Sequence, residues 1–350
     1  MSAEIFTERG SVLVRLIKKM KVDSFISKNP ALLFHLTGQK NISGYILFYN
    51  DELKFITDRR FLGEIETIKD IIPAEIYTNS LTTYIKPLRK HFKNTGIEFS
   101  RITHAEYLSV SEILKSGFID ASRLVDSYLA SVDNKQLDSF LRGVDVTKTL
   151  FNHAYQLFEQ NISITEKELA AELGKMMLRN GADNFSFEPI IAADENAAKP
   201  HHTPSDKVLH DCKVLLVDIG VVYDGMCTDV TRTFHRNSKK AKRVESIVKQ
   251  GFEQVLKQVK AGVKVSKLSS EWKAITEKHK LTENFTHALG HGLGYEVHQA
   301  PRISTFSKEV LTNNQIITLE PALYFPDEFG YRYECDILVT KDSGINLTAF

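Results

Sequence analysis

Two aspartates lie on one face of a predicted β-hairpin. The apolar run 214–222 predicts a buried strand that holds Asp218, and Asp224-Gly225 is typical of a two-residue hairpin turn. Counting outward from that turn makes Asp218 and Asp229 diagonal neighbours, with Cβ atoms roughly 7 Å apart or less. Two buried carboxylates repel each other, and a divalent cation would resolve the repulsion. The alternative is that one Asp belongs to a turn and the other to a solvated strand.

A second segment, residues 285–302, carries His287, His291 and His298 among three glycines. Glycine lets the backbone approach a ligand closely, and imidazole is a good nitrogen donor to a metal. A lone histidine is more often structural than ligating. The acidic hairpin reverses those odds for His291, which we predict to be a metal ligand.

A third element holds Glu320 and Glu334, fourteen residues apart in strand-like apolar surroundings. A loop centred on Asp327 would place the two glutamates opposite each other across an antiparallel pair of strands. A single glutamate on a strand is usually solvated. Four inward carboxylates with one histidine, however, form an oxygen-rich set suited to two divalent ions about 3.5–4 Å apart.

The elements that must position these groups fall into two regions. The first region alternates short strands and helices, which predicts an α/β domain. Its helices are expected over 11–21, 61–69, 81–92 and 104–115, and its strands over 23–27, 44–49 and 53–57, the last two joined as a hairpin at Asn50-Asp51.

From about Ser127 the pattern changes to long helices followed by strands. A helix is expected over 135–160, and a capping box of Thr165 and Glu168 begins another that ends at Asn180-Gly181. Further helices are expected over 241–260 and 267–279. We therefore predict domains over residues 1–125 and 126–350.

Composition limits the classes of function. Lys and Arg number 45 against 44 for Asp and Glu, a formal net charge of +1, so a global electrostatic footprint for nucleic acid or an anionic membrane is excluded. The three cysteines show no C-x-x-C spacing, which favours reduced thiols. The first residues lack the pattern of a signal or transit peptide, and no apolar run could span a bilayer. These features predict a soluble cytoplasmic protein.

The ordered set Asp218, Asp229, His291, Glu320 and Glu334 resembles the metal ligands of metallopeptidase family M24, the pita-bread group that includes methionine aminopeptidase, aminopeptidase P and prolidase. The resemblance covers about residues 125–348. The sequence motifs that carry the resemblance are Val-Asp-Ile-Gly, Thr-Asp-Val-Thr-Arg-Thr, Gly-His-Gly-Leu-Gly, Val-His-Gln-Ala-Pro-Arg, Leu-Glu-Pro and Arg-Tyr-Glu. Leu-Thr-Gly (36–38) and Phe-Ile-Thr-Asp-Arg-Arg-Phe (55–61) resemble the amino-terminal domain of the proline-specific branch.

The resemblance implies a small creatinase-like α/β domain, then a pita-bread catalytic domain with an antiparallel curved sheet flanked by helices. It implies two divalent ions, with Mn²⁺ favoured by the oxygen-rich ligand set and Co²⁺ or Zn²⁺ as other occupants. Asp218 would chelate one ion, while Asp229 and Glu334 bridge both ions. His291 and Glu320 would complete the second site.

The resemblance also gives roles to residues around the metals. Glu320 would be the general base, and His298 and His201 would hold the substrate or stabilise the developing oxyanion. Arg302 would meet a substrate carboxylate. Arg332 and His287 would orient the ligands.

The implied reaction is hydrolysis of the bond between an N-terminal residue and a following proline, in a dipeptide or a short peptide. The N-terminal domain would limit substrate length, and a homodimer is implied by the resemblance alone. Gln299 replaces the usual Glu after His298, Ala322 replaces the usual Gly after Glu-Pro, and residues 129–133 lack the usual Arg-x-x-Lys. None of these departures touches a predicted ligand.

Three alternatives remain open. A methionine aminopeptidase has the same five ligands, but the added N-terminal domain and the Pro200-His201-His202 segment argue against it. A metal-free creatinase-like hydrolase would lack several of the ligands. A catalytically silent binding protein that kept the fold would usually lose ligands or gain basic insertions.

Overall fold

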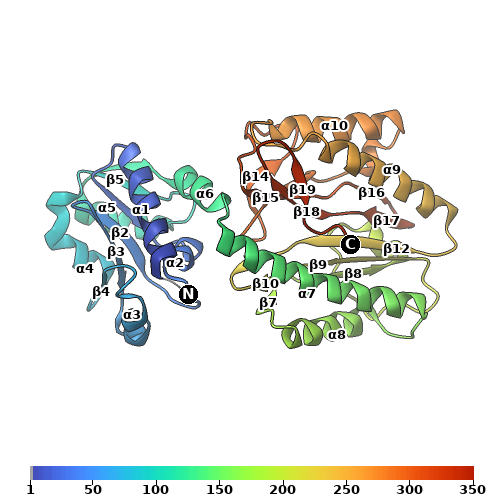
Figure 1. Cartoon of the computed structure of the whole chain (residues 1–350), viewed down its shortest axis with the longest axis horizontal. Helices are drawn as coiled ribbons and strands as arrows, with labels where there is room; N and C mark the ends of the chain where they lie inside the picture. The colour runs from blue at the N-terminus through green and yellow to red at the C-terminus, as the bar shows by residue number, and fades with distance from the viewer. Residues whose placement is uncertain (1–2) are drawn as a thin grey trace. The chain divides into compact units, whose positions relative to one another are not determined.

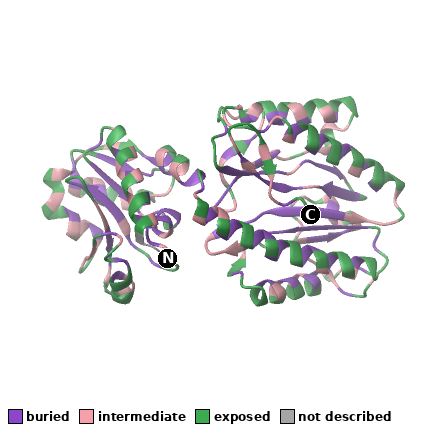
Figure 2. Ribbon diagram, in the orientation of Figure 1, coloured by how far each residue is buried: buried purple, intermediate pink, exposed green. Residues whose placement is uncertain are grey.

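The computed structural model describes residues 3–350 and divides into two compact units, one ending at Leu129 and the other beginning at Ala130. Residues 1 and 2, which belong to the N-terminal segment in which the sequence predicts no signal or transit peptide, lie outside the described residues, so this prediction is not tested there. Each unit has its own hydrophobic core of strands covered by helices, and Figure 2 shows the strands largely buried and the outer helix faces exposed.

The first unit is a mixed six-stranded sheet in the order β4-β3-β2-β1-β5-β6. The β1–β5, β5–β6 and β3–β4 pairs are parallel, while β1–β2 and β2–β3 are antiparallel. Its elements are α1 (Ala3–Lys19), β1 (Ser24–Ser27), α2 (Pro30–Thr37), β2 (Tyr45–Tyr49), β3 (Glu52–Thr57), α3 (Leu62–Ile68), β4 (Ala74–Ile76), α4 (Leu81–Ile85), β5 (Asn94–Ile97), α5 (His104–Leu114), β6 (Gly117–Asp120) and α6 (Ser122–Ala130). The predicted α/β class and the β2–β3 hairpin are confirmed.

Two helices of this unit differ from the prediction. The helix that we expect to start at Ser11 starts at Ala3 instead. Phe6, which precedes Gly10, is buried in the core and extends the apolar face of the helix toward its N-terminus. The single helix expected over 81–92 is divided, with α4 ending at Ile85 and a 3₁₀ helix over Lys86–His91. Pro87 explains the division, since proline lacks the N–H that an α-helix requires.

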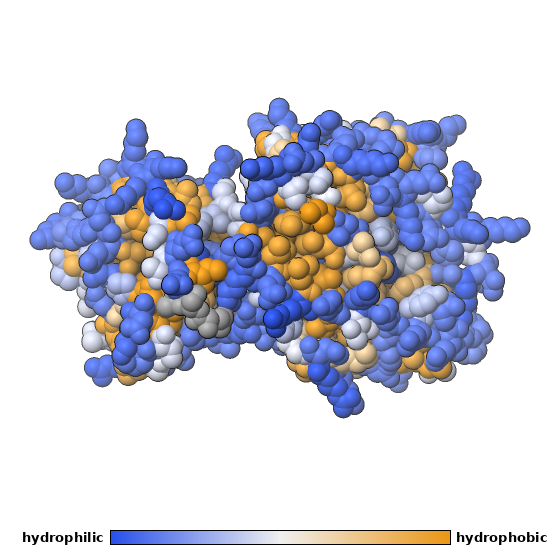
Figure 3. Space-filling model, viewed as in Figure 1, coloured by the Kyte–Doolittle hydropathy of each residue, from blue (hydrophilic) through white to orange (hydrophobic). Residues whose placement is uncertain are grey.

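The second unit packs four helices around antiparallel strands. Its helices are α7 (Asn134–Glu159), α8 (Glu166–Arg179), α9 (Lys239–Leu256) and α10 (Val265–Lys278). Figure 1 shows α7 and α8 on one side of the strands and α9 and α10 on the other. Apolar faces of each pair pack on the strands, while Figure 3 shows mostly hydrophilic side chains on the outward helix surfaces. The predicted helices all form, but α9 ends at Leu256 rather than near Lys260.

Between the helix pairs lie short antiparallel strands in four sheets. These strands are β7 (Asn184–Phe185), β8 (Ile190–Ala193), β9 (Val214–Ile219), β10 (Val221–Tyr223), β11 (Met226–Cys227), β12 (Val230–His235), β13 (Gly290–Leu293), β14 (Gln299–Ile303), β15 (Gln315–Leu319), β16 (Ala322–Phe325), β17 (Phe329–Arg332), β18 (Cys335–Val339) and β19 (Gly344–Asn346). The sheet orders are β11-β10-β7, β12-β9-β8, β14-β13-β15-β18-β19 and β16-β17.

The first hairpin has the predicted register. Tyr223 pairs with Met226 across the Asp224-Gly225 turn, where both turn residues have positive φ. The same register continues to Asp218, which pairs with Thr231. The hairpin is nevertheless divided between two sheets, because the strands stop pairing at Gly220 and Asp229.

The second hairpin is divided in the same way. Phe325 pairs with Phe329 around Asp327, and the register continues through the pair of Leu319 and Cys335 on the other side of the break. Glu320 and Glu334 lie in the break itself, outside any strand, so their expected placement on strands is wrong. Their backbone N–H groups bond to other segments there, that of Glu320 to the carbonyl of Leu289 and that of Glu334 to the carbonyl of Thr231.

Gly220 allows the break in the first hairpin. A Cβ atom at this position would lie 1.8 Å from the carbonyl oxygen of Thr228 and 2.3 Å from Oγ of Ser186. Ser186 donates from Oγ to that carbonyl (2.8 Å), so three segments meet where only glycine fits.

We expect Gly220→Ala to destabilise the second unit by about 2–4 kcal/mol, because backbone would have to move to admit the methyl group. Denaturant unfolding followed by the fluorescence of Trp272, the single tryptophan of the chain, measures this. Gly174→Ala in α8 is the control, since its Cβ would meet only a Phe185 ring at 3.3 Å. An equal effect of both substitutions contradicts the interpretation.

Candidate metal centre

The five predicted ligands line one cavity of about 640 Å³ inside the second unit. Asp218 comes from β9, His291 from β13, and the other three from the two hairpin breaks. Asp218, Asp229 and Glu334 are 6%, 5% and 2% exposed. The cavity therefore gathers four acidic groups in a nearly dry environment, where each charge is costly to hold.

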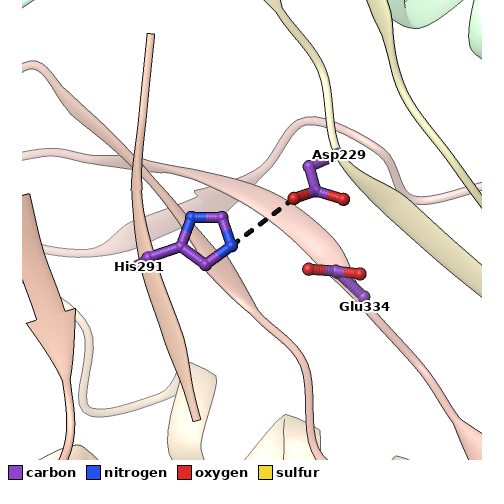
Figure 4. A group of neighbouring side chains, drawn as sticks. All are labelled: Asp229, His291 and Glu334. Atoms are coloured by element: carbon purple, nitrogen blue, oxygen red, sulfur yellow. Dashed lines mark ion pairs between the residues drawn. The ribbon is translucent and has the colours of Figure 1, made fainter. Parts of the chain in front are cut away.

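Three of the five lie closest together. One ligand atom each from Asp229, His291 and Glu334 falls within 4.8 Å of the others. Figure 4 shows the three side chains turned toward one another. Nε2 of His291 is 3.4 Å from Oδ2 of Asp229 and 4.0 Å from Oε1 of Glu320. The Nδ1 atom of His291 is 3.0 Å from the carbonyl oxygen of Gly292, which leaves Nε2 facing the carboxylates.

Among the described residues, a hydrogen-bond donor reaches only one of the two carboxylate oxygens of Asp218. Nη2 of Arg332 donates to its Oδ2 at 2.5 Å, while no described residue hydrogen-bonds its buried Oδ1. A buried carboxylate oxygen without a donor is costly. A divalent cation would satisfy Oδ1, so the structure fits a metal at this wall of the cavity.

Burial, helped by repulsion between neighbouring carboxylates, raises the pKa of three of the acids. Burial, with repulsion from Asp229, raises the pKa of Asp218 to about 6, although Arg332 acts in the opposite direction. Burial raises the pKa of Glu320 to about 7 and that of Glu334 well above its ordinary value. For His291, burial acts to lower the pKa but is outweighed by Asp229 and Glu320, giving about 9. Added positive charge is what this cluster needs to stay ionised.

Arg332 organises one side of the cavity. Its Nε donates to Oγ1 of Thr231 (3.0 Å), and that hydroxyl donates to Oε2 of Glu334 (2.7 Å). Its Nη1 donates to the hydroxyl of Tyr324 (2.7 Å). The guanidinium thus contacts Asp218 directly and reaches Glu334 through Thr231.

His287 connects this network to Glu320. Burial, and then the charge of Arg332, lower the pKa of His287 to about 3, so its imidazole is neutral. Nδ1 is 2.7 Å from the carbonyl oxygen of Ala288, which assigns the proton to Nδ1. Nε2 then accepts from the hydroxyl of Tyr324 at 3.0 Å. Nδ1 also lies 3.4 Å from Oε2 of Glu320, which restricts that carboxylate.

The predicted substrate-binding residues line the same cavity: His201, His298 and Arg302. The ring of His298 packs edge-on against that of His291, with centroids 4.5 Å apart. Gln299, one of the departures from the family pattern, also lines the cavity, whereas Ala322 is buried in β16. His202 has its Nε2 2.8 Å from Glu166.

Sequence reasoning did not give roles to Thr231, Tyr324 or Asp336. Asp336 is fully buried, and its Oδ2 accepts from the backbone N–H of Asp229 at 3.3 Å. A signal for Thr231 was present, since the hairpin register puts its hydroxyl directly opposite Asp218. Nothing in the local sequence marks Tyr324 or Asp336.

Among the described residues, no helix combines the length and apolar character needed to cross a membrane. Cys212, Cys227 and Cys335 are all buried free thiols.

Comparisons with known proteins cover both units. Residues 139–341 match Metallopeptidase family M24, and residues 9–128 match the Creatinase/Prolidase N-terminal domain. A Xaa-Pro dipeptidase from Pyrococcus horikoshii is 27% identical over 350 residues, which cover 99% of this chain and 98% of that protein.

Solved structures give the same result. The X-Pro aminopeptidase from Thermotoga maritima has a TM-score of 0.85 at 28% identity, covering 96% of this chain and 98% of that chain. The Xaa-Pro dipeptidase from Bacillus anthracis has a TM-score of 0.88 at 26% identity, covering 100% of this chain and 98% of that chain. The predicted fold class is confirmed, with a creatinase-type domain before a pita-bread domain.

Thr231→Val tests the hydrogen bonds around the cluster. The substitution keeps the shape of the side chain but removes the hydroxyl between Arg332 and Glu334, so we expect divalent metal to bind about 10–100-fold more weakly. Isothermal titration of the metal-free protein with Mn²⁺ measures the affinity. The control is Thr276→Val in α10, where the lost hydroxyl bonds only to Lys273. Equal affinities in the two variants would show that Thr231 does not support the metal.

Proposed function

Because the chain belongs to metallopeptidase family M24, as its motifs predict, we propose that it hydrolyses the bond between an N-terminal residue and a following proline. The observation that carries the proposal is one cavity lined by three buried acids, the half-buried Glu320, His291 and the polar groups of His201, His298 and Arg302. Relatives named Xaa-Pro dipeptidase match this chain over both units, which supports proline in the second position.

We propose that Asp218, Asp229, His291, Glu320 and Glu334 hold two divalent ions, with Mn²⁺ preferred because most of the ligands are oxygen atoms. When bound, such ions polarise the scissile carbonyl and lower the pKa of the attacking water. Family M24 uses divalent metals, and the orphaned Oδ1 of Asp218 supports a cation in this cavity.

The remaining steps belong to side chains. Glu320 is proposed to accept the proton of the attacking water and deliver it to the leaving proline nitrogen. His298 and His201 are proposed to hold the scissile peptide and to donate to the oxygen on which negative charge develops. Arg302 would meet the C-terminal carboxylate of a dipeptide. Arg332 and His287 would fix the positions of Asp218 and Glu320 through the contacts described above.

We propose the cytoplasm as the location, since the three cysteines are free thiols that a reducing compartment preserves. A homodimer is proposed on the family resemblance alone.

The substrate proposal predicts that the Mn²⁺-loaded protein cleaves an Xaa-Pro dipeptide, an Xaa-Pro-Yaa tripeptide, or both, and that chelation abolishes cleavage. Product analysis by chromatography, with and without Mn²⁺, measures this. Met-Ala-Ser is the matched substrate for the methionine aminopeptidase alternative. Cleavage of Met-Ala-Ser with neither proline peptide cleaved would refute the proline assignment.

Two isosteric substitutions test the ligand and base proposals. Asp229→Asn removes a carboxylate that would hold the ions, so metal affinity and kcat should both fall, kcat by roughly 10³-fold or more. Glu320→Gln should lower kcat by roughly 10²–10⁴-fold, since it removes the proton acceptor. It should also weaken metal binding, since Glu320 is a proposed ligand. Activity assays and metal titrations of both variants check this. Full activity of Asp229→Asn would contradict the metal assignment, and full activity of Glu320→Gln would contradict the base assignment.

A further inference from the structure

Glu166, the first residue of α8, is a fully buried carboxylate outside the metal cavity. Five donors surround it. Its Oε1 accepts from the backbone N–H of Ala193 (2.8 Å) and from Nδ2 of Asn196 (3.0 Å). Its Oε2 accepts from the backbone N–H of Ser205 (2.8 Å) and from the Oγ hydroxyl of Ser205 (2.6 Å). The same Oε2 atom lies 2.8 Å from Nε2 of His202.

These donors belong to the two ends of one loop. Ala193 ends β8 and Asn196 lies in the 3₁₀ helix Asp194–Ala198, whereas His202 and Ser205 follow the loop's tip. Oε1 binds the first end and Oε2 binds the second. A single carboxylate therefore holds the ends of this segment, residues 193–205, against α8.

The tip of the loop reaches the metal cavity. Pro200 and His201 line the cavity between the two tethered ends. The carbonyl oxygen of Pro200 accepts from Nη1 of Arg332 (3.2 Å), the guanidinium that also binds Asp218. Displacement of the loop would thus move His201 relative to the metal ligands.

The hydrogen bonds keep Glu166 charged. Burial alone would raise its pKa, but the donors, with Asn196 and Ser205 first, lower the pKa below its ordinary value. A buried anion with five donors has little freedom to move, because each displaced donor would leave part of the charge unsatisfied. Glu166 is therefore held firmly in place, unlike an acidic residue that is solvated at the start of a helix.

We propose that Glu166 is a positioning residue that sets where His201 meets the substrate. The proposal rests on the substrate-binding role given to His201 in the proposed function. Glu166 does not itself line the cavity and contacts none of the proposed metal ligands. It acts through the loop, whose residues His201 and His202 line the cavity. Its loss should weaken substrate binding while metal binding is retained.

The test uses Glu166→Gln, which keeps the size of the side chain but turns an amide NH₂ toward donors. We expect KM for an Xaa-Pro dipeptide to rise at least 10-fold, with kcat and Mn²⁺ affinity within about 3-fold of wild type. Equilibrium binding of a non-hydrolysable Xaa-Pro analogue should weaken by the same factor as KM rises. Glu172→Gln, an exposed glutamate of the same helix, should behave as wild type.

A double-mutant cycle separates positioning from general structural damage. His201→Ala should raise KM, and adding Glu166→Gln to it should raise KM less than 2-fold further. If the two effects multiply, or if Glu166→Gln alone leaves KM unchanged, the proposal for Glu166 is overturned. If His201→Ala has no effect, the substrate role of His201 in the proposed function fails instead.

His202→Asn supplies a milder variant in case Glu166→Gln does not fold, as judged by circular dichroism. It removes one of the five donors and leaves the carboxylate bonded by the other four. We expect KM to rise about 3–10-fold, and this rise should vanish in the His201→Ala background. An unchanged KM in a folded His202→Asn protein would overturn the proposal.

Discussion

Mutual repulsion among buried carboxylates is the constraint on which the second unit depends. Asp218, Asp229 and Glu334 are almost wholly buried. Arg332 contacts Asp218, and His291, whose pKa is raised to about 9, contacts Asp229. These two groups cannot balance four acids, so burial and repulsion raise the pKa values of Asp218, Glu320 and Glu334. Divalent cations would supply the missing charge and satisfy the open oxygen of Asp218. A bound metal would in this sense stabilise the folded state as well as supply the chemistry.

Two hairpins of the second unit position these acids. In each hairpin the ladder of paired residues has a gap, and the acids lie in or beside these gaps. Each hairpin keeps one register on both sides of its break, and three of the five predicted ligands lie in the breaks. Within a continuous ladder the backbone at these positions would pair with its neighbour. At a break the backbone bonds differently: the N–H of Asp229 donates to Asp336 and that of Glu320 to the carbonyl of Leu289. The carboxylates are then aimed by tertiary contacts, and Gly220 provides the space in which the first break forms.

Local signals explain how much the sequence could predict. The Asp-Gly turn specifies the first hairpin register, and the long periodic helices and the Thr165 capping box are confirmed because their signals lie within a few residues. The sequence does not predict either hairpin break, since strand-like apolar residues lie on both sides of each break. Glu166 was missed for a related reason: beside a capping threonine it has the sequence of a solvated helix start, yet a loop more than twenty-five residues away buries it. Tyr324 and Asp336 likewise gain their partners only from distant segments.

We propose that the carboxylate cluster holds divalent ions. Anomalous X-ray diffraction from crystals grown with Mn²⁺, collected at the manganese absorption edge, tests this directly. We expect two peaks about 3.5–4 Å apart inside the cavity, among Asp218, Asp229, His291, Glu320 and Glu334. A map with manganese absent from the cavity, or bound only elsewhere on the surface, would contradict it.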